Sequence, residues 1–295
     1  MPRYTDLRVS SVLGNSQLLD GGAMFGNAPR PLWERWSKPD SLGRIALACR
    51  SMLLELDGVS LLCETGIGAY MEPALAERYG LVESDHCLLA NLKALDRAPE
   101  DIDYVILSHL HFDHAGGLLP AYAEIVQGHD GLVFPKAKIV VGREAWNRAR
   151  QPHPRDRASF IPGLVDKIEA SGRLVVVEGD SLPGFPSDQI SFRYSHGHTP
   201  GHMHTLVRGP QETMFFAGDL IPGKAWVHLP ITMGYDRFAE QVIDEKQALY
   251  DDAVPNHWNV FYTHDSAIAA SQVLKDSKDR YITSKEQTSL IRYRL

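Results

Sequence analysis

The sequence predicts a mixed α/β fold in a single domain that spans residues 1–295. Strand-like apolar runs and periodic helix-like segments follow one another along the chain in the order strands, helices, strands, helices. The length of 295 residues allows one large domain or two and is ample for a substantial core. The share of apolar residues, 44%, and of charged residues, 23%, is ordinary for a globular protein.

Charge and cysteine content narrow the class of protein. The net charge of -7 offers no basic surface for nucleic acid, so we expect a small-molecule substrate instead. Three cysteines without a CxxC spacing indicate neither a disulfide framework nor a thiolate metal site. No stretch approaches 18 uncharged apolar residues, and residues 1–6 lack the apolar segment of a signal peptide. We therefore expect a cytoplasmic protein without membrane association, and a homodimer is compatible with these data.

The first part of the chain has strand patterns followed by helix patterns. Strand-like residues occur at 7–9, 12–13 and 17–20, and longer apolar runs predict strands at 45–49, 51–56 and 59–63. The tight turn Asp57-Gly58 predicts that the last two pair antiparallel. Helical periodicity follows at 72–79 and 86–95.

A glycine-rich segment at 21–26 interrupts this pattern and contains Met24 and Phe25. Such a segment is hard to bury as a regular element, so it predicts a loop that presents both side chains. Packing of the two side chains into the core is the alternative.

The stretch 108–114 follows a predicted core strand at 102–107 and contains three histidines and an aspartate. Because His109 and His111 are two positions apart, their side chains share one face of an extended chain. Asp113 and His114 follow just before two glycines that allow the backbone to turn. Four such side chains at the end of a strand indicate a metal site, and they can divide between two ions.

The second half of the chain repeats strands and then a helix. Apolar runs predict strands at 138–141, 174–177, 190–194, 205–207, 214–217 and 260–262. Helices are expected over parts of 118–126, from Glu144, and around Val242 and Leu249 with Asp236 as cap. The irregular residues 150–163 are expected to border an active site, since long loops often do. Residues 279–295 are expected to form a surface tail or a last helix.

The sequence HLHFDH at 109–114 resembles the HxHxDH signature of the metallo-β-lactamase superfamily of metal-dependent hydrolases. The resemblance extends to three later residues in the order that the superfamily requires, namely His202 after Thr-Pro-Gly, Asp219 after Ala-Gly and His264 after Tyr-Thr. It implies a four-layer αβ/βα sandwich, in which two sheets pack together under outer helices. Periodicity alone predicts only the mixed α/β class.

The same resemblance implies two divalent metal ions. Their ligands run from position 109 to position 264 and have to converge on one site, so no domain boundary can divide this span. One ion would take His109, His111 and His202, the other would take Asp113, His114 and His264, and Asp219 would bridge them. Nitrogen and oxygen donors without thiolate suit zinc, although manganese, iron and cobalt accept the same donors. The resemblance further implies that a metal-bridging hydroxide attacks the substrate, with Asp113 and Asp219 as the catalytic carboxylates.

Four histidines near the Pro-Gly turn leave a rival assignment open, because His196, His198, His202 and His204 all lie there. We choose His202 as ligand because it ends the turn. His204 is expected in the following strand, and His196 and His198 are expected to support other residues.

The chain departs from the superfamily pattern at two places. Glu64 stands where the superfamily usually has the aspartate of Asp-Thr-Gly. Its longer side chain implies a shifted loop or a different partner, and an exposed turn residue is the alternative. Pro222 stands where related acyl-homoserine lactonases have a tyrosine that assists the substrate carbonyl. That role is vacant or belongs to Tyr235 or Tyr194.

Residues 20–33 resemble the amino-terminal segment of the quorum-quenching lactonases, a subgroup related to methyl parathion hydrolase. We therefore expect a hydrolase that opens a lactone of the N-acyl homoserine type, with Met24, Phe25 and Trp226 as candidates for binding the acyl tail. A phosphotriester hydrolase, another ester or thioester hydrolase, and a non-catalytic regulatory member are the alternatives. The complete ligand set argues against the last.

Overall fold

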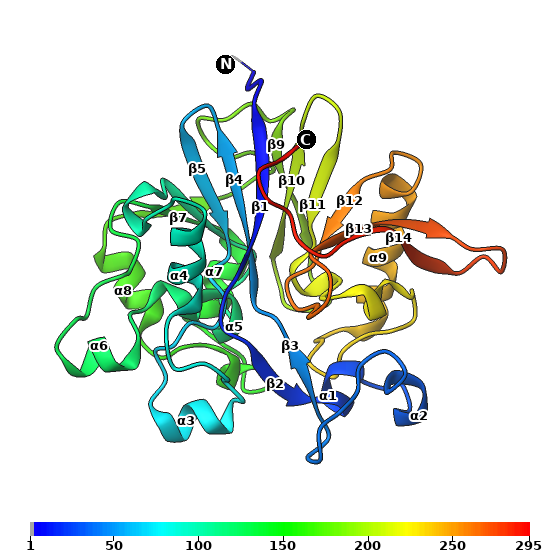
Figure 1. Cartoon of the computed structure of the whole chain (residues 1–295), viewed down its shortest axis with the longest axis horizontal. Coiled ribbons are helices and arrows are strands. Elements are labelled where there is room, and N and C mark those ends of the chain that lie inside the picture. Colours follow the sequence, from blue (N-terminus) through cyan, green and yellow to red (C-terminus); the bar gives the residue numbers. More distant parts are fainter. Residues whose placement is uncertain (1–2) are drawn as a thin grey trace.

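Two large β-sheets pack face to face through the middle of the protein (Figure 1). In the computed structural model, which describes residues 3–295, the first sheet has seven strands in the order β15 (Tyr293–Arg294), β1 (Leu7–Leu13), β4 (Arg50–Leu56), β5 (Val59–Cys63), β6 (Tyr104–Leu107), β7 (Lys138–Gly142) and β8 (Leu174–Val177). The second sheet has six strands in the order β14 (Tyr281–Gln287), β13 (Ala270–Lys275), β12 (Asn259–Phe261), β11 (Thr213–Phe216), β10 (His202–Arg208) and β9 (Ile190–Ser195). A separate pair joins β2 (Gln17–Asp20) and β3 (Arg44–Leu47).

Apolar side chains alternate between the inner and outer faces of these sheets. In β6, Ile106 packs between the sheets, whereas Val105 and Leu107 face the outer helices. In β11, Phe216 points inward and Phe215 outward. Because both faces are covered, these strands are continuous apolar runs, and each fully buried large side chain contributes roughly 1.5–3 kcal/mol.

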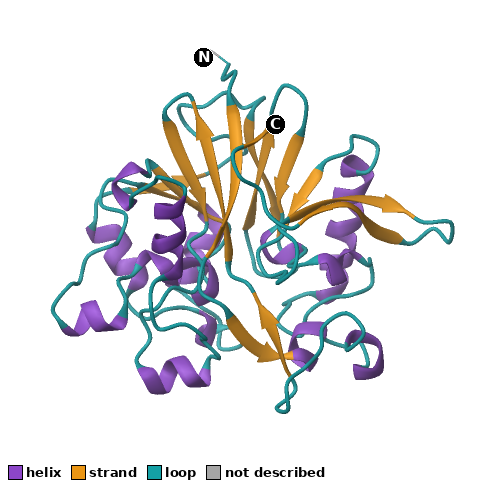
Figure 2. Cartoon of the chain, in the orientation of Figure 1, coloured by secondary structure: helices purple, strands orange, loops and turns teal. Residues whose placement is uncertain are grey.

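Helices cover the outer face of each sheet (Figure 2). The first sheet is covered by α4 (Cys87–Ala94), α7 (Arg143–Arg150) and α8 (Leu164–Ala170), and the second by α9 (Ala239–Ala253). Shorter helices lie in the connections: α1 (Gly21–Phe25), α2 (Arg30–Trp33), α3 (Pro73–Arg78), α5 (Phe112–Ala115) and α6 (Tyr122–Val126). The predicted four-layer αβ/βα sandwich is confirmed. None of the helices within residues 3–295 combines the length and apolarity needed to cross a bilayer.

The structure corrects two expectations about local structure. The glycine-rich segment is not a loop but the helix α1, whose first turn is capped by Asp20 through a 2.7 Å bond from the N–H of Ala23. Residues 279–295 form neither a tail nor a last helix, because they contribute β14 to the second sheet and β15 to the first. The helix α8 was not anticipated.

Candidate metal centre

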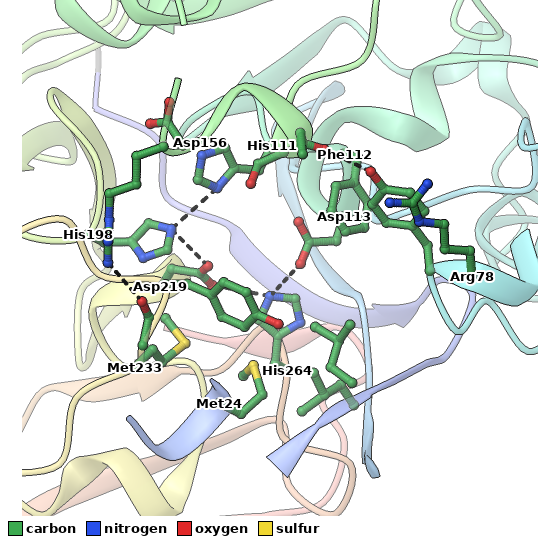
Figure 3. A pocket seen from close by; sticks show the side chains of 18 residues that line it. Met24, Arg78, His111, Phe112, Asp113, Asp156, His198, Asp219, Met233 and His264 are labelled. Carbon is green, nitrogen blue, oxygen red and sulfur yellow. Dashed lines mark hydrogen bonds and ion pairs between the residues drawn. The ribbon is translucent and has the colours of Figure 1, made fainter. Parts of the chain in front are cut away.

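The candidate ligands lie just beyond the carboxyl ends of four strands, the position at which α/β sheets bind ligands. Figure 3 shows five of them, His111, Asp113, His198, Asp219 and His264, around one cavity. These strands belong to both sheets, so the side chains approach one another from two sides. After β6 come His109 and His111 and then Asp113 and His114 in α5; His198 follows β9, Asp219 follows β11, and His264 follows β12.

A first group of donors consists of His109, His111 and His198, whose ligand atoms lie within 4.8 Å of one another. Nε2 of His198 is 3.4 Å from Nδ1 of His111 and 3.1 Å from Oδ2 of Asp219. Nε2 of His109 is buried and has no hydrogen-bond partner within residues 3–295. Burying a ring nitrogen without a hydrogen-bond partner costs free energy. A metal ion held by this donor group would give Nε2 of His109 the partner that it lacks.

A second group consists of Asp113, His114 and His264, again with ligand atoms within 4.8 Å of one another. Nε2 of His264 lies 3.1 Å from Oδ1 of Asp219, 3.2 Å from Nε2 of His114 and 3.6 Å from Oδ2 of Asp113. Asp219 therefore directs Oδ1 at this group and Oδ2 at the first group. Its carboxylate has the placement expected of a bridging ligand.

His202 does not join the first group, and this corrects its predicted role. The buried ring uses Nε2 to accept the backbone N–H of Asp219 at 3.3 Å, and its Nδ1 faces Oγ of Ser195 at 3.2 Å. His202 begins β10, so it stands at the amino end of a strand, whereas His198 follows the carboxyl end of β9. The donor side chains follow the carboxyl ends of strands. His198, and not His202, is therefore the third histidine of the first donor group.

The other two histidines of this region, His196 and His204, belong to neither donor group. His204 is fully buried, stacks on Phe215, and pairs Nε2 with Oγ of Ser195 at 2.8 Å. Burial lowers the pKa of His204 to about 3, so its ring is neutral. His196 is partly exposed and lies 3.2 Å from Glu144.

Two buried carboxylates, Asp236 and Glu64, contact ring nitrogens of His198 and His114 and so orient these rings. Asp236, expected to cap α9, instead places Oδ1 2.9 Å from Nδ1 of His198, and Phe238 occupies the cap position. Glu64 is fully buried rather than exposed; its Oε2 lies 2.8 Å from Nδ1 of His114, and its Oε1 accepts the hydroxyl of Ser108. Such partners fix the ring orientation and tautomer of metal-binding histidines. The longer Glu64 side chain thus reaches the candidate centre.

His264 is held by two residues that precede it by more than 200 positions, Ala48 between β3 and β4 and Arg50 at the start of β4. Its Nδ1 donates to the carbonyl of Ala48 at 2.7 Å. The buried guanidinium of Arg50 donates to the carbonyls of Tyr262 at 2.9 Å and Asp265 at 2.8 Å, on either side of His264. The planar fork of arginine suits two acceptors at fixed separation, so Arg50 fixes this loop against β4.

The electrostatics of the site favour a cation. Burial and then neighbouring imidazoles hold the pKa of His109 and His111 well below the usual range, which leaves neutral rings that can bind metal. Burial would raise the pKa of Asp219, but His114, His198 and His264 hold it well below its usual value. Burial would also lower the pKa of His264, but Asp219 raises it well above the usual value. Positive charge is therefore stabilised here, and the donor set fits divalent metals.

The candidate centre lies at the base of a cavity of about 500 Å³. Apolar side chains form part of its wall, namely Leu19, Met24, Leu47 and Met233, and Tyr235 also faces it. The wall segment 228–236 is anchored by the buried ammonium of Lys246, which donates to the carbonyls of His228, Leu229 and Ile231 at 3.0 Å each. The three N–H groups of Lys246 match these three acceptors.

Only one of the three residues predicted for the substrate pocket lines the cavity. Met24 lines the cavity, but Phe25 and Trp226 do not. Their rings stack with centroids 4.5 Å apart, and Phe25 also stacks on Trp33 at 5.5 Å. Nε1 of Trp226 donates to the carbonyl of Met24 at 2.9 Å, so both aromatic residues support Met24 from the core.

Of the two tyrosines considered for the role at Pro222, only Tyr235 lines the cavity. Tyr194 donates its hydroxyl to the carbonyl of Gly179 at 2.6 Å and packs with the apolar layer between the sheets. Pro222 itself accepts the N–H of His264 through its carbonyl at 2.8 Å. Burial, followed by the charge of Asp113, raises the pKa of Tyr235, so its hydroxyl stays protonated at neutral pH.

Residues 44–264, which contain every candidate ligand, match the family described as the metallo-beta-lactamase superfamily. The chain belongs to this superfamily. The superfamily that the motifs predict is thereby confirmed, and the fold and the histidine and acid clusters suit the divalent metals that its name implies.

Two solved structures share the fold over nearly the whole chain. A probable metal-dependent hydrolase from Staphylococcus aureus is 25% identical and has a TM-score of 0.83, with 96% of this chain and 99% of that chain covered. AidC, described as a dizinc quorum-quenching lactonase in complex with a product, is 17% identical with a TM-score of 0.73, and the match covers 96% of this chain and 95% of AidC. At that identity the likeness to AidC shows the fold alone.

Curated relatives in the superfamily include lactonases. An N-acyl homoserine lactonase of Bacillus cereus is 28% identical over 183 residues, which are 57% of this chain and 61% of that relative. The N-acyl homoserine lactonase AttM of Azorhizobium caulinodans is 29% identical over 132 residues, 44% of this chain and 45% of AttM. The chain thus spans less than two thirds of the length of these relatives.

Proposed function

We propose that the protein is a metal-dependent hydrolase that opens lactones of the N-acyl homoserine type, with two divalent ions, zinc foremost, as its cofactors. One observation carries this proposal: the two oxygens of Asp219 face two separate donor groups, 3.1 Å from His198 and 3.1 Å from His264, at the base of an open cavity. The lactonases among the curated relatives support the substrate class.

In this proposal the metal ions activate water and the substrate carbonyl, and side chains of the cavity transfer the proton and bind the substrate. Bound there, divalent ions would lower the pKa of water and polarise the substrate carbonyl oxygen. Asp113 lines the cavity and can hold the proton released in the attack and return it to the leaving alkoxide. Tyr235 can donate its hydroxyl to the substrate. In a lactone the leaving alkoxide stays tethered to the acyl group, so it remains within reach of Asp113.

The apolar wall of the cavity suits an acyl tail. Met24 and Met233 are flexible apolar side chains, and Leu19 and Leu47 lie on the same wall. Each methylene that they cover contributes up to about 0.8 kcal/mol. We therefore expect KM to fall as the acyl chain lengthens until the wall ends.

The test combines metal analysis with a substrate panel. Purified protein saturated with zinc should contain about two ions per chain, because seven ligands would crowd a single ion. Values of kcat/KM are then compared across acyl lactones of increasing length, phosphotriesters, thioesters and β-lactams. Chelated protein is the matched control. Faster turnover of a phosphotriester such as paraoxon than of every lactone would replace the lactonase proposal with organophosphate hydrolysis, and full activity with one ion would refute the two-metal site.

A further inference from the structure

The charged side chains that line the cavity differ in whether they have a partner within the protein. They are the carboxylates Asp113, Asp156 and Asp219 and the arginines Arg78 and Arg155. Asp113 and Asp219 belong to the candidate metal centre. Asp156 is buried and accepts two bonds from Arg148, at 2.9 and 2.7 Å, and one from Arg237 at 3.5 Å. All three carboxylates therefore have cationic or metal-binding partners, and the arginines are the charges left to meet a ligand.

The two arginines differ in what holds them. Arg155 donates to the carbonyls of Gly234 at 3.1 Å and Asp236 at 3.4 Å, so part of its guanidinium belongs to the cavity wall. Arg78 lies at the carboxyl end of α3 and is exposed, and its side chain has no hydrogen bond or ion pair to any of residues 3–295. Among residues 3–295, Arg78 is thus the cation of the cavity that has no protein partner.

The backbone that carries Arg78 is fixed although its guanidinium is free. The neighbouring Tyr79 donates its hydroxyl to the carbonyl of Ala158 at 3.1 Å, and its ring meets that of Phe112 edge to face with centroids 4.8 Å apart. This contact joins α3 to the loop that carries Arg155. Arg78, Phe112 and Asp113 all line the cavity and are labelled on the same side of it in Figure 3.

We propose that Arg78 binds a carboxylate that the substrate carries at a point away from its scissile bond. This inference rests on the proposed function and narrows the substrate class to lactones whose acyl part ends in a carboxylate. A planar guanidinium can bind a carboxylate through two parallel hydrogen bonds, which neutral acyl tails cannot accept. The protein as a whole carries a net charge of -7, so a free cation in the cavity offsets the general repulsion of an anionic substrate.

The test uses two N-acyl lactones of equal length, one ending in a carboxylate and the other in its methyl ester, with the metal-loaded protein. In the wild type, kcat/KM for the carboxylate substrate should exceed that for the ester by roughly tenfold, through KM, since charge-assisted hydrogen bonds at an exposed site are of this strength. In Arg78→Gln the ratio should fall to about one. Raising the salt concentration should reduce the wild-type ratio as well, because the pair is exposed.

Arg157→Gln is the matched control, because Arg157 is exposed on the neighbouring loop and does not line the cavity. Its substrate ratio should equal that of the wild type. Equal kcat/KM for both substrates in the wild type, or an equal loss for both in Arg78→Gln, would overturn the proposal.

Binding of the corresponding lactams separates this inference from the proposed function, because an amide carbonyl is a poorer target for hydrolysis than the ester carbonyl of a lactone. Calorimetry should give tighter binding of the carboxylate lactam than of the ester lactam, and Arg78→Gln should remove the difference. If no lactone is turned over but this difference is found, the proposed function fails and the carboxylate subsite stands. If lactones are turned over and the difference is absent, the subsite is wrong.

Discussion

Nε2 of His198 lies 3.1 Å from Oδ2 of Asp219, and this contact ties the first donor group to the carboxylate that also faces His264. The ring of His198 is in turn held by Asp236 at 2.9 Å. His198 therefore connects a buried carboxylate on one side with the shared carboxylate on the other, which is the arrangement of an oriented metal ligand.

Replacing His198 should remove a ligand, whereas replacing His202 should not. His198→Ala should lower the metal content and reduce kcat/KM by more than the roughly 10- to 100-fold that follows loss of a supporting partner. His202→Ala should keep the metal and lose about 1–3 kcal/mol of stability, because the N–H of Asp219 loses its acceptor. Elemental analysis and urea unfolding separate the two effects.

His196→Ala is the control for this pair, since His196 lies in the same turn but is partly exposed and pairs with Glu144. Its metal content should equal that of the wild type. Normal metal content in His198→Ala together with depleted metal in His202→Ala would restore the assignment made from the sequence.

The difference between these histidines marks the limit of sequence reasoning at the site. The HxHxDH pattern and the single residues Asp219 and His264 can be found because each directly follows an apolar strand. His198 follows a strand as well, but the Pro-Gly turn favours His202 in the sequence. The start of β10 at His202 separates the two histidines in the structure. That boundary depends on pairing of His202 with Ser195 in β9, which sequence periodicity does not reveal.

Fold prediction reached a similar limit where distant residues decide local structure. The strands at 51–56 and 59–63 follow from their apolar pattern and the turn between them. The burial of Phe25 does not, because it depends on stacking against Trp226, some 200 positions later. The strand β14 is hard to detect in the sequence because it is an edge strand whose residues 283–287 are all polar, which weakens the apolar signal.

The contact between Glu64 and His114 should raise metal affinity. Glu64→Gln keeps the size of the side chain but removes the charge 2.8 Å from Nδ1 of His114. Metal affinity, measured by competition with a chelator, should fall about 10- to 100-fold. Glu55→Gln is the control, because Glu55 pairs with Arg97 away from the site. Equal affinities in both variants would show that Glu64 has no part in the centre.

Arg50 should contribute to stability through its two carbonyl contacts. Arg50→Lys keeps the charge, but a single ammonium cannot reproduce the fork that binds Tyr262 and Asp265 on either side of His264. A buried carbonyl left without a donor costs about 1–3 kcal/mol, so urea unfolding of the chelated protein should detect the change. Unchanged unfolding would mean that the loop after β12 is held by its backbone bonds alone.

The hydroxyl of Tyr235 should matter for turnover rather than for metal binding. It lines the cavity and stays protonated because burial and Asp113 raise its pKa. Loss of one such hydrogen bond in Tyr235→Phe should reduce kcat about tenfold with metal content unchanged. Tyr194→Phe is the matched control, since that hydroxyl is bound to Gly179 outside the cavity. If the two variants have the same kcat, Tyr235 does not contact the reacting carbonyl.

Stability should depend on pH through His204. Burial lowers the pKa of His204 to about 3 in the folded protein, whereas an unfolded chain has a histidine pKa of about 6.5. Between these values the unfolded state binds a proton that the folded state does not, so the free energy of unfolding falls as the pH drops from about 6.5 toward 3. Above about pH 6.5 the stabilisation is complete, and the total loss at the acid end is on the order of 5 kcal/mol.

His204→Phe isolates this contribution, because phenylalanine can stack on Phe215 and cannot titrate. Urea unfolding of chelated wild type and variant is compared at intervals from pH 7 to pH 4. The wild-type free energy should decline more steeply, by up to about 1.4 kcal/mol per pH unit, since one proton is involved. The other buried histidines titrate in both proteins, so their effect cancels in the difference. Parallel curves would mean that His204 binds its proton equally in both states, which its burial and its short contact with Ser195 argue against.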